Sequence, residues 1–357
     1  MKLPISMLSC AGFLAMAPFV YAQEPTSSPV DAAMRKEVVE QVTKLLNDHY
    51  VFPDFAKKVE IALTQKMRAG EFDALKDAVK FAEKLTEEIQ GVTRDKHIRV
   101  RYSAKPLPER VRNEPTAGEL AEFRKDAEIK NFGVDKVERL PGNIGYIELR
   151  GFLPAELAGE AIAAAMTLVA HTETLIVDLR RNGGGDPATV ALMTSYLFDN
   201  RTHLNSFYNR EGDRTTQFWT QDWVPGKRFG QTKPVYVLTG KRTFSGAEEF
   251  SYNLKNLKRG TIVGETTGGG AHPGGMRRIN AHFHIFVPGG RAINPITNTN
   301  WEGMGVEPDV KVPADDALRT AQILALKKII EKEKGPGYLK MLQERVAELE
   351  KATPPKS

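Results

Sequence analysis

The chain has 357 residues, of which 41% are hydrophobic and 27% are charged, and its formal net charge at pH 7 is +5. This composition is typical of a globular protein that can bury a sizeable core, as one large domain with a smaller one or as two ordinary domains. No run of lysine or arginine reaches five residues. A dedicated nucleic-acid surface, which needs clustered positive charge, is therefore not expected.

Residues 1–22 are predicted to be a cleavable signal peptide rather than part of the fold. Lys2 supplies a positive start, an apolar stretch runs from Met7 to Val20, and Ala22 completes a small-residue cleavage site. The apolar stretch is too short for a membrane span, which needs about 20 residues. We expect export to the periplasm or the exterior without stable membrane insertion; a retained N-terminal anchor is the alternative.

The single cysteine, Cys10, lies within this signal. Its removal would leave a mature protein without a thiol, which excludes disulfide bonds, a cysteine nucleophile and cysteine-rich zinc sites. A protein without thiols suits an oxidising compartment.

Helical patterns dominate the first third of the chain. Apolar residues recur at spacings of three and four from Asp31 to about Gln90, which predicts a small helical N-terminal domain over residues 23–100. Residues 101–142 are polar and contain prolines. They are predicted to form a connecting arm with one short helix near 117–130.

Strands alternate with helices over residues 143–315, so the fold class is predicted to be α/β with a mostly parallel sheet and helical crossovers. Two further helices are expected within 316–357, and a hairpin is expected between 282–287 and 291–295. The strands expected in this α/β core are 144–149, 175–177, 235–238 and 261–263, with helices at 156–171, 186–198 and 246–257.

Ser245 stands on the turn after the strand at 235–238, where α/β proteins place reacting groups. Gly246 and Ala247 are expected to present unpaired N–H groups at the start of the next helix, ready for an oxyanion. The Ser-x-x-Glu pattern that ends at Glu248 is also a capping box, so a purely structural role for Ser245 stays open.

Three other segments are candidates for chemistry. Successive glycines at 183–185 allow positive φ and close approach of a substrate, although a plain turn is the alternative. His97 lies at the end of the helical domain and could be catalytic or purely structural. Glu302 lies in a glycine-rich turn and could be catalytic or simply solvated. The aromatic segment 200–230 is a candidate lid or cleft wall, or a segment that merely packs on the core.

His272, His282 and His284 are candidates for a metal site, because the last two share one face of a strand. No His-Glu-x-x-His motif or nearby acidic cluster accompanies them, so no metal is expected. The chain also lacks a phosphate loop and Rossmann glycine spacing, so no nucleotide cofactor is expected. His272 is instead a candidate for lining a substrate cleft.

Four motifs carry a family resemblance, and they follow one another as DLRRNGGGD, TFSGAEEF, GTIVGETTGGGAHPGG and WEGMGVEPDVKV. In this order they resemble the superfamily of tail-specific (C-terminal-processing) proteases, the tricorn protease core and interphotoreceptor retinoid-binding protein. The resemblance covers roughly residues 140–315 and extends to Asp95-Lys96-His97. It implies a crotonase-like (ClpP/crotonase) core, a nucleophile at Ser245, and an oxyanion hole formed by Gly246 and Gly184.

The resemblance also indicates the base. Tail-specific proteases use a lysine in a Gly-Glu-x-Thr-x-Gly-Lys segment, and the matching residue here is Gly270. The tricorn-like branch uses a histidine from an Asp-x-His segment and a glutamate before a Gly-Val-x-Pro-Asp motif, which correspond to His97 and Glu302. Histidine titrates near neutral pH without tuning, whereas lysine needs a lowered pKa. The implied machinery is a serine-type peptidase relay of Ser245, His97 and Glu302.

The expected substrates are peptides or unfolded proteins. The interval 102–142 is too short for the PDZ module of tail-specific proteases, so capture of a C-terminal carboxylate by such a module is not expected. The retinoid-binding relatives keep the fold while carrying hydrophobic ligands. A non-catalytic binding protein for retinoid or fatty-acid-like ligands therefore stays the alternative, and the sequence makes no prediction of the oligomeric state.

Overall fold

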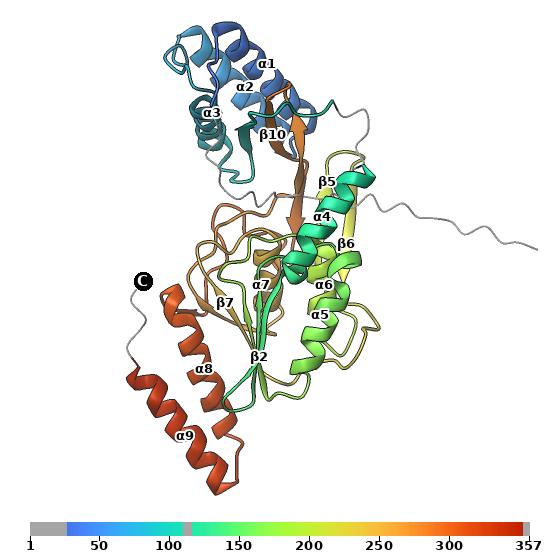
Figure 1. Ribbon diagram of the computed structural model, residues 1–357, viewed down its shortest axis with the longest axis vertical. Helices are drawn as coiled ribbons and strands as arrows, with labels where there is room; N and C mark the ends of the chain where they lie inside the picture. Colours follow the sequence, from blue (N-terminus) through green and yellow to red (C-terminus); the bar gives the residue numbers. More distant parts are fainter. Residues whose placement is uncertain (1–26, 110–115, 353–357) are drawn as a thin grey trace, which may run out of the picture.

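The computed structural model describes residues 27–109 and 116–352, which form a helical N-terminal part and a larger α/β part (Figure 1). The predicted signal peptide, residues 1–22, lies outside the described residues. Within the described ranges, no helix is long and apolar enough to cross a membrane. Figure 1 shows the N-terminal helices above the sheet of the α/β part, and the last two helices at the opposite end.

Three helices and a three-stranded antiparallel sheet build the N-terminal part. Asp31 caps the first helix by accepting from the N–H of Met34, and Asp77 caps the third by accepting from the N–H of Lys80. The sheet has the order β1-β10-β9. The elements are α1 (Ala32–His49), α2 (Pro53–Arg68), α3 (Ala78–Thr93), β1 (Arg99–Tyr102), β9 (Gly274–Arg278) and β10 (Phe283–Pro288).

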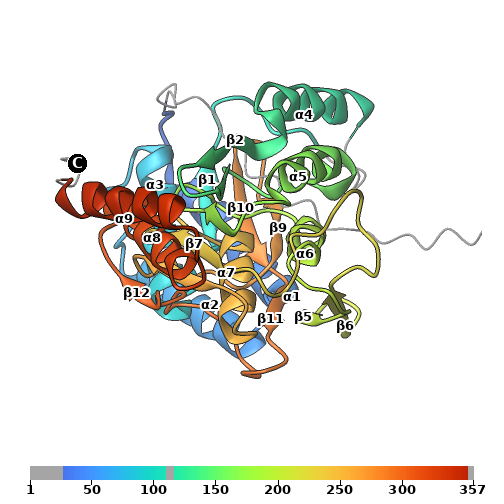
Figure 2. The ribbon, with the colours of Figure 1, turned by 90° about the horizontal axis from the view of Figure 1, so that it is seen from below.

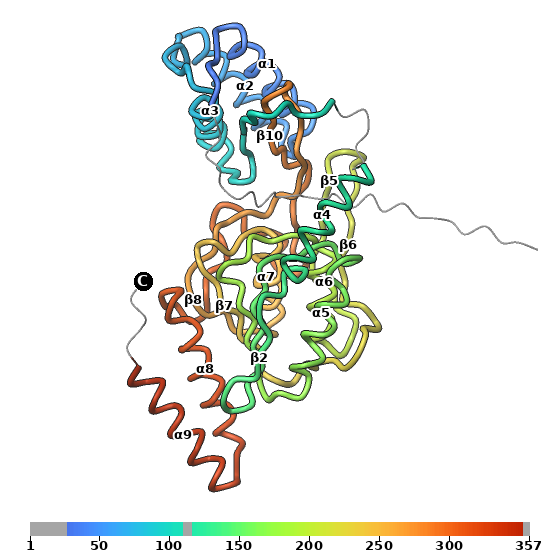
Figure 3. Tube along the Cα trace, in the orientation of Figure 1, coloured from blue at the N-terminus to red at the C-terminus, as the bar shows by residue number. Residues whose placement is uncertain are grey.

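Strand β10 corrects two predictions. It pairs with β9 and β1, whereas β11 (Gly290–Ile293) pairs with β5 (His203–Asn209), so the hairpin between 282–287 and 291–295 does not form. The apolar face of β10, with Phe283, Ile285 and Val287, completes the core of the N-terminal helices. The predicted domain of residues 23–100 is therefore completed by a β-hairpin from late in the chain, formed by β9 and β10. Figure 3 shows this segment in orange.

A six-stranded sheet forms the centre of the α/β part, which confirms the predicted fold class of a mostly parallel sheet with helices. Its order is β12-β8-β7-β4-β3-β2, and all neighbours are parallel except β2 and β3. The strands are β2 (Val134–Leu140), β3 (Ile144–Leu149), β4 (Thr174–Asp178), β7 (Val235–Thr239), β8 (Thr261–Gly264) and β12 (Val310–Lys311).

Edge strand β2 lies inside residues 101–142, which were predicted as a connecting arm. The α/β part thus begins near Val134 rather than at residue 143. This strand was missed because its sequence is mostly polar, as an edge strand with an exposed face allows. The short helix predicted near 117–130 is present as α4 (Ala117–Ile129).

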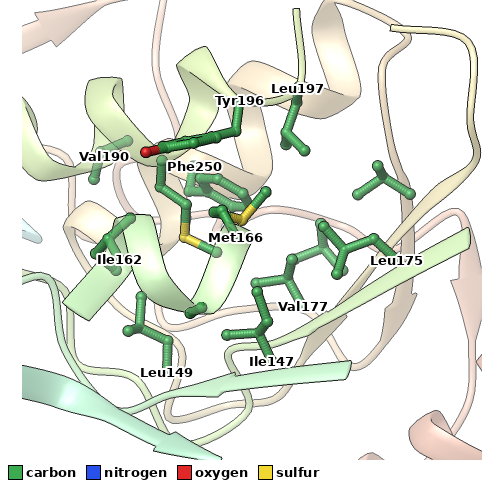
Figure 4. Packing of buried hydrophobic residues seen from close by; sticks show 14 of the residues in the cluster. Ile147, Leu149, Ile162, Met166, Leu175, Val177, Val190, Tyr196, Leu197 and Phe250 are labelled. Carbon is green, nitrogen blue, oxygen red and sulfur yellow. The ribbon is translucent and has the colours of Figure 1, made fainter. Parts of the chain in front are cut away.

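Helices cover both faces of the central sheet, as the view in Figure 2 shows. One face packs against α5, α6 and α7, and the other against α8 and α9. Strands β3, β4 and β7 are buried along their whole length, as expected for a parallel sheet between two helical layers. Figure 4 shows the first layer interdigitating, with Met166 and Phe250 between the sheet and Tyr196. The helices are α5 (Ala155–Val169), α6 (Pro187–Ser195), α7 (Gly246–Asn256), α8 (Ala314–Ile330) and α9 (Pro336–Lys351).

The aromatic segment 200–230 forms strands β5 and β6 (Arg214–Trp219) of a third sheet, with the order β11-β5-β6. Phe207 packs edge-on against Phe218, with ring centroids 5.5 Å apart, and also contacts a small cluster around Trp301. Packing therefore accounts for part of this segment, while Trp223 stays exposed.

Candidate active site

Ser245 stands at the junction of β7 and α7 with an unusual backbone. Its φ is 53° and its ψ is −120°, whereas an ordinary helix N-cap has an extended backbone. A non-glycine residue in such a region costs on the order of 1–3 kcal/mol. Hydrolases use a strained strand-to-helix turn of this kind to expose a nucleophilic serine. The N–H of Ser245 donates to Oε2 of Glu248 at 2.8 Å, and the predicted capping box is formed.

The glycine turn after β4 packs directly against Ser245. Gly184 has a φ of +101°, and a Cβ added to it would lie 2.7 Å from the Cβ of Ser245 and 2.6 Å from the N of Gly246. Only glycine fits this approach. The N–H of Gly184 donates to Oδ1 of Asn182 at 2.8 Å. Its predicted oxyanion role would therefore require the N–H to leave this partner.

The amides near the nucleophile differ from the expectation in one respect. The N–H of Ala247 donates to the carbonyl of Phe244 at 3.1 Å, so it is not a free donor. The N–H of Gly246 has no partner in the described part of the chain, and neither has that of Gly185 beside it. Gly185 was missed because three successive glycines look alike in the sequence, and only folding decides which N–H stays free.

Glu248 is a buried anchor beneath the glycine loop 268–270. It is fully buried and accepts four hydrogen bonds, so its role is to fix the loop and the nucleophile turn together. Burial raises its pKa to about 7, against the opposing effect of its donors. The donors are the hydroxyl of Thr267 (2.5 Å) and the N–H groups of Gly269 (2.6 Å), Gly270 (2.8 Å) and Ser245 (2.8 Å).

His97, the predicted base, packs its ring over the glycine loop. The ring centroid lies 4.7 Å from that of Phe244, the neighbour of Ser245. A Cβ added to Gly270 would lie 2.6 Å from Cε1 of His97. Burial lowers the pKa of His97 to about 4, so the ring is neutral at pH 7. In the residues described, no hydrogen bond joins a His97 nitrogen to Oγ of Ser245.

Glu302 is anchored through one oxygen only. The N–H of Ala271 donates to its Oε2 at 2.5 Å. Oε1 of Glu302 is buried, and so is Nδ1 of His97. Neither atom has a hydrogen-bond partner among the described residues. A ring nitrogen of His97 and a carboxylate oxygen of Glu302 lie within 4.8 Å of each other. The fold thus brings the predicted base and its orienting carboxylate into one buried space.

Asp95 and His272 lie in the same space, and their pairing was not predicted. Oδ2 of Asp95 is 2.7 Å from Nδ1 of His272 and accepts from the hydroxyl of Tyr50 at 3.2 Å. Oδ1 of Asp95 accepts from the backbone N–H of His97 at 3.0 Å. His272 is only 6% exposed, so it belongs to the interior rather than to the cleft surface that was predicted for it. Burial and the charge of Asp95 raise the pKa of Glu302 to about 7, and His272 opposes this shift.

Asp95, His97 and Glu302 are also the group best placed to meet a metal, since their ligand atoms lie within 4.8 Å of one another. Zinc ligands at bonds of about 2.0–2.1 Å lie roughly 3.4 Å apart in a tetrahedron. Nδ1 of His97 and Oδ1 of Asp95 lie 3.8 Å apart, so the set would have to contract to hold zinc.

Among the described residues, the three candidate metal histidines do not form a cluster. His272 pairs with Asp95, whereas Nδ1 of His282 lies 2.9 Å from the carbonyl oxygen of Ser103. His284 sits on β10, opposite Arg278 and Arg101 in the sheet.

Both parts of the chain match known families. Residues 143–312 match peptidase family S41, and residues 32–135 match the N-terminal domain of peptidase S41 in eukaryotic IRBP. Carboxyl-terminal-processing peptidase 1 of Arabidopsis thaliana, a chloroplast protein, is 25% identical over 191 residues. That match covers 53% of this chain and 38% of the plant protein, so the chain spans well under half the length of that relative.

Solved structures of low sequence identity share the fold. A putative peptidase from Parabacteroides merdae is 17% identical, with a TM-score of 0.56 over 82% of this chain and 96% of that one. Mature CPAF is 13% identical, with a TM-score of 0.57 over 84% of this chain and 99% of that one. Because the two family matches follow in order along the N-terminal and α/β parts, the chain belongs to peptidase family S41, a family of serine-type peptidases.

Proposed function

We propose that this chain hydrolyses peptide bonds with Ser245 as nucleophile, His97 as general base and Glu302 as the carboxylate that orients the base. The observation that carries the proposal is the backbone of Ser245, at φ 53° and ψ −120°. Helix capping needs no such strain, whereas presentation of a nucleophile does. The free oxygen of Glu302 and the free ring nitrogen of His97 in one buried space support the other two roles.

The chemistry follows from these groups. Oγ of Ser245 attacks the scissile carbonyl carbon while a nitrogen of His97 takes the hydroxyl proton. Oε1 of Glu302 accepts from the other ring N–H and stabilises the imidazolium that forms. The N–H of Gly246, with a second amide from the turn at 184–185, donates to the oxyanion. His97 then returns the proton to the leaving amine, and water cleaves the acyl-enzyme by the same steps.

The packing at Gly270 supports a histidine rather than a lysine as the base. The position that matches the lysine of tail-specific proteases has no side chain, and a Cβ there would collide with the His97 ring. The two bases therefore compete for one space. A Gly270→Lys variant is expected to displace His97 and to lose activity rather than restore a lysine mechanism.

Three finer features belong to the same proposal. The α/β part is proposed to be a crotonase-like core, with peptides or unfolded proteins as substrates. Export to the periplasm or the exterior is supported by the segment 1–22, with its positive start and short apolar stretch. N-terminal sequencing of the exported chain tests this point, and the mature protein is expected to begin near Gln23.

Labelling with a fluorophosphonate probe tests the nucleophile. Wild type is expected to be labelled, Ser245→Ala is not, and Ser251→Ala, which removes another serine of α7, is labelled like wild type. Equal weak labelling of wild type and Ser245→Ala contradicts the proposal. Co-purified lipid without peptide cleavage would favour the ligand-carrying alternative.

The base is tested by His97→Ala, which is expected to lower kcat/KM by about 10³-fold or more, since the serine loses its proton acceptor. Circular dichroism establishes that the variant is folded. Unchanged turnover would remove His97 from the relay.

A further inference from the structure

The ring of His272 is held between two buried carboxylates. Its Nδ1 lies 2.7 Å from Oδ2 of Asp95 and 3.4 Å from Oε2 of Glu302. The side chains of His272, Asp95 and Glu302 are only 7%, 0% and 14% exposed. Phe52 packs edge-on against the ring, with centroids 5.2 Å apart. A single N–H group therefore faces two acids in an environment with little water.

Charge is unevenly distributed around Glu302. Asp95 and, more weakly, Glu248 add negative charge near Glu302, and each disfavours its ionisation. Tyr50 contributes a neutral hydroxyl, bonded to Asp95. His97 is neutral at pH 7 because burial lowers its pKa. Among these neighbours, His272 is the group whose charge favours an ionised Glu302.

The same contact also orients the carboxylate. Oε2 of Glu302 is held by the N–H of Ala271 and faces Nδ1 of His272, so Oε1 is the oxygen left without a partner. If Oε2 were released, the carboxylate would rotate about its terminal torsion, which is broad for glutamate. Oε1 would then no longer be fixed as the acceptor that the proposed relay needs for a ring N–H of His97.

We propose that His272, anchored by Asp95, is a positioning residue of the peptidase site: it favours the ionised form of Glu302 and keeps that carboxylate turned toward His97. The inference rests on the proposed relay. It assigns His272 neither to the cleft wall nor to proton transfer with substrate.

The test is the pH profile of kcat/KM, or of the labelling rate, in His272→Gln. Loss of the His272 contact is expected to raise the pKa of Glu302 and to move the acid limb of the profile to higher pH. For a shift of about one unit, activity falls about tenfold at pH 6 and less than about twofold at pH 9. His282→Gln, which removes a partly buried histidine outside this cluster, is expected to keep the wild-type profile.

A second variant guards against misfolding. His272→Ala opens a space that added imidazole fits, and imidazole is expected to restore the wild-type acid limb. The inference is overturned if His272→Gln keeps the wild-type limb, or if activity falls by the same factor at every pH. Both of these outcomes leave the proposed function standing when wild type is labelled and His97→Ala is not. Failure of wild type to react would instead overturn the proposed function.

Discussion

Two glutamates, Glu248 fully buried and Glu302 half-buried, border the glycine loop 268–270 and the adjoining Ala271, and burial raises the pKa of each to about 7. Their hydrogen bonds nevertheless differ. Both oxygens of Glu248 are occupied, with two donors each, whereas Glu302 binds through Oε2 and leaves Oε1 free. Similar pKa values thus accompany opposite states of hydrogen-bond satisfaction.

The difference separates structure from chemistry. A carboxylate with every acceptor position used fixes the atoms around it, and any change of partner would cost it a hydrogen bond. A carboxylate with one buried, unpaired oxygen is incomplete as structure, because such atoms are rarely left without partners. We infer that Glu248 holds the loop in place and that Glu302 is available for His97.

Removal of Glu248 is expected to have the largest effect. In Glu248→Ala four donors lose their acceptor, and we expect the free energy of unfolding to fall by about 4 kcal/mol. Urea denaturation measures this. Glu265→Ala, a nearby glutamate with only a long contact to Lys241, is the control and should change stability by less than about 0.5 kcal/mol. A near-neutral Glu248→Ala would remove the distinction between the two glutamates.

Glu302→Gln is expected to show the opposite pattern. The amide oxygen can still accept from the N–H of Ala271, so stability at pH 5, where Glu302 of the folded protein is protonated, should change by less than about 1 kcal/mol. The amide cannot stabilise an imidazolium on His97, so kcat/KM should fall by about 100-fold. Peptide hydrolysis and urea denaturation on the same sample give both numbers. If instead stability collapses and the remaining folded fraction is fully active, Glu302 is structural and the comparison is reversed.

Local signals made a large share of the fold and the site predictable. Continuous apolar strands between capped helices indicated the parallel sheet, and the turn before α7 placed Ser245 on its edge. The ordered motifs brought Glu302 and His97 into the same hypothesis, although 205 positions separate the two residues along the chain. Such motifs retain chemistry that local patterns do not reveal.

The remainder depends on contacts that are distant in sequence and carry no local signature. Asp95 pairs with His272 across 177 positions, and neither residue differs in sequence from a surface acid or a loop histidine. The sequence predicts that strand β10 pairs with β11, the strand that follows it. In the structure the apolar face of β10 packs against the N-terminal helices. The N–H of Gly184 was expected to be free. In the structure it donates to Oδ1 of Asn182, a contact that depends on the conformation of that side chain.

The pH dependence sharpens the comparison with a smaller effect. Because the pKa of Glu302 is raised from 4.5 to about 7, its share of stability is full below about pH 4.5 and is lost as pH rises through 7. Activity needs the ionised form and should rise over the same interval, about tenfold per unit below pH 7. The wild-type rate should show this acid limb, and Glu302→Gln should lack it. A limb that persists in Glu302→Gln belongs to another group.

Wild type and Glu302→Gln can also be compared in their free energies of unfolding. Between pH 5 and 7.5, wild type should lose stability relative to Glu302→Gln, as followed by urea denaturation at each pH. Differences between the two proteins cancel the contributions of other buried acids, such as Glu249, whose pKa burial raises to about 8. A difference that is constant with pH would contradict the raised pKa of Glu302.

Lys96 provides the weakest of the contacts that hold this loop. Its Nζ donates to the carbonyl of Gly268 at 2.6 Å on the exposed side, opposite the buried anchor Glu248. A single exposed contact contributes little, so Lys96→Met should cost less than about 1 kcal/mol in urea denaturation and less than about threefold in kcat/KM. Lys241→Met, at a largely exposed lysine, is the matched control. If Lys96→Met lowers activity as strongly as Glu302→Gln, the exposed contact of Lys96 fixes the loop. The four hydrogen bonds of Glu248 are then not what keeps His97 and Glu302 together.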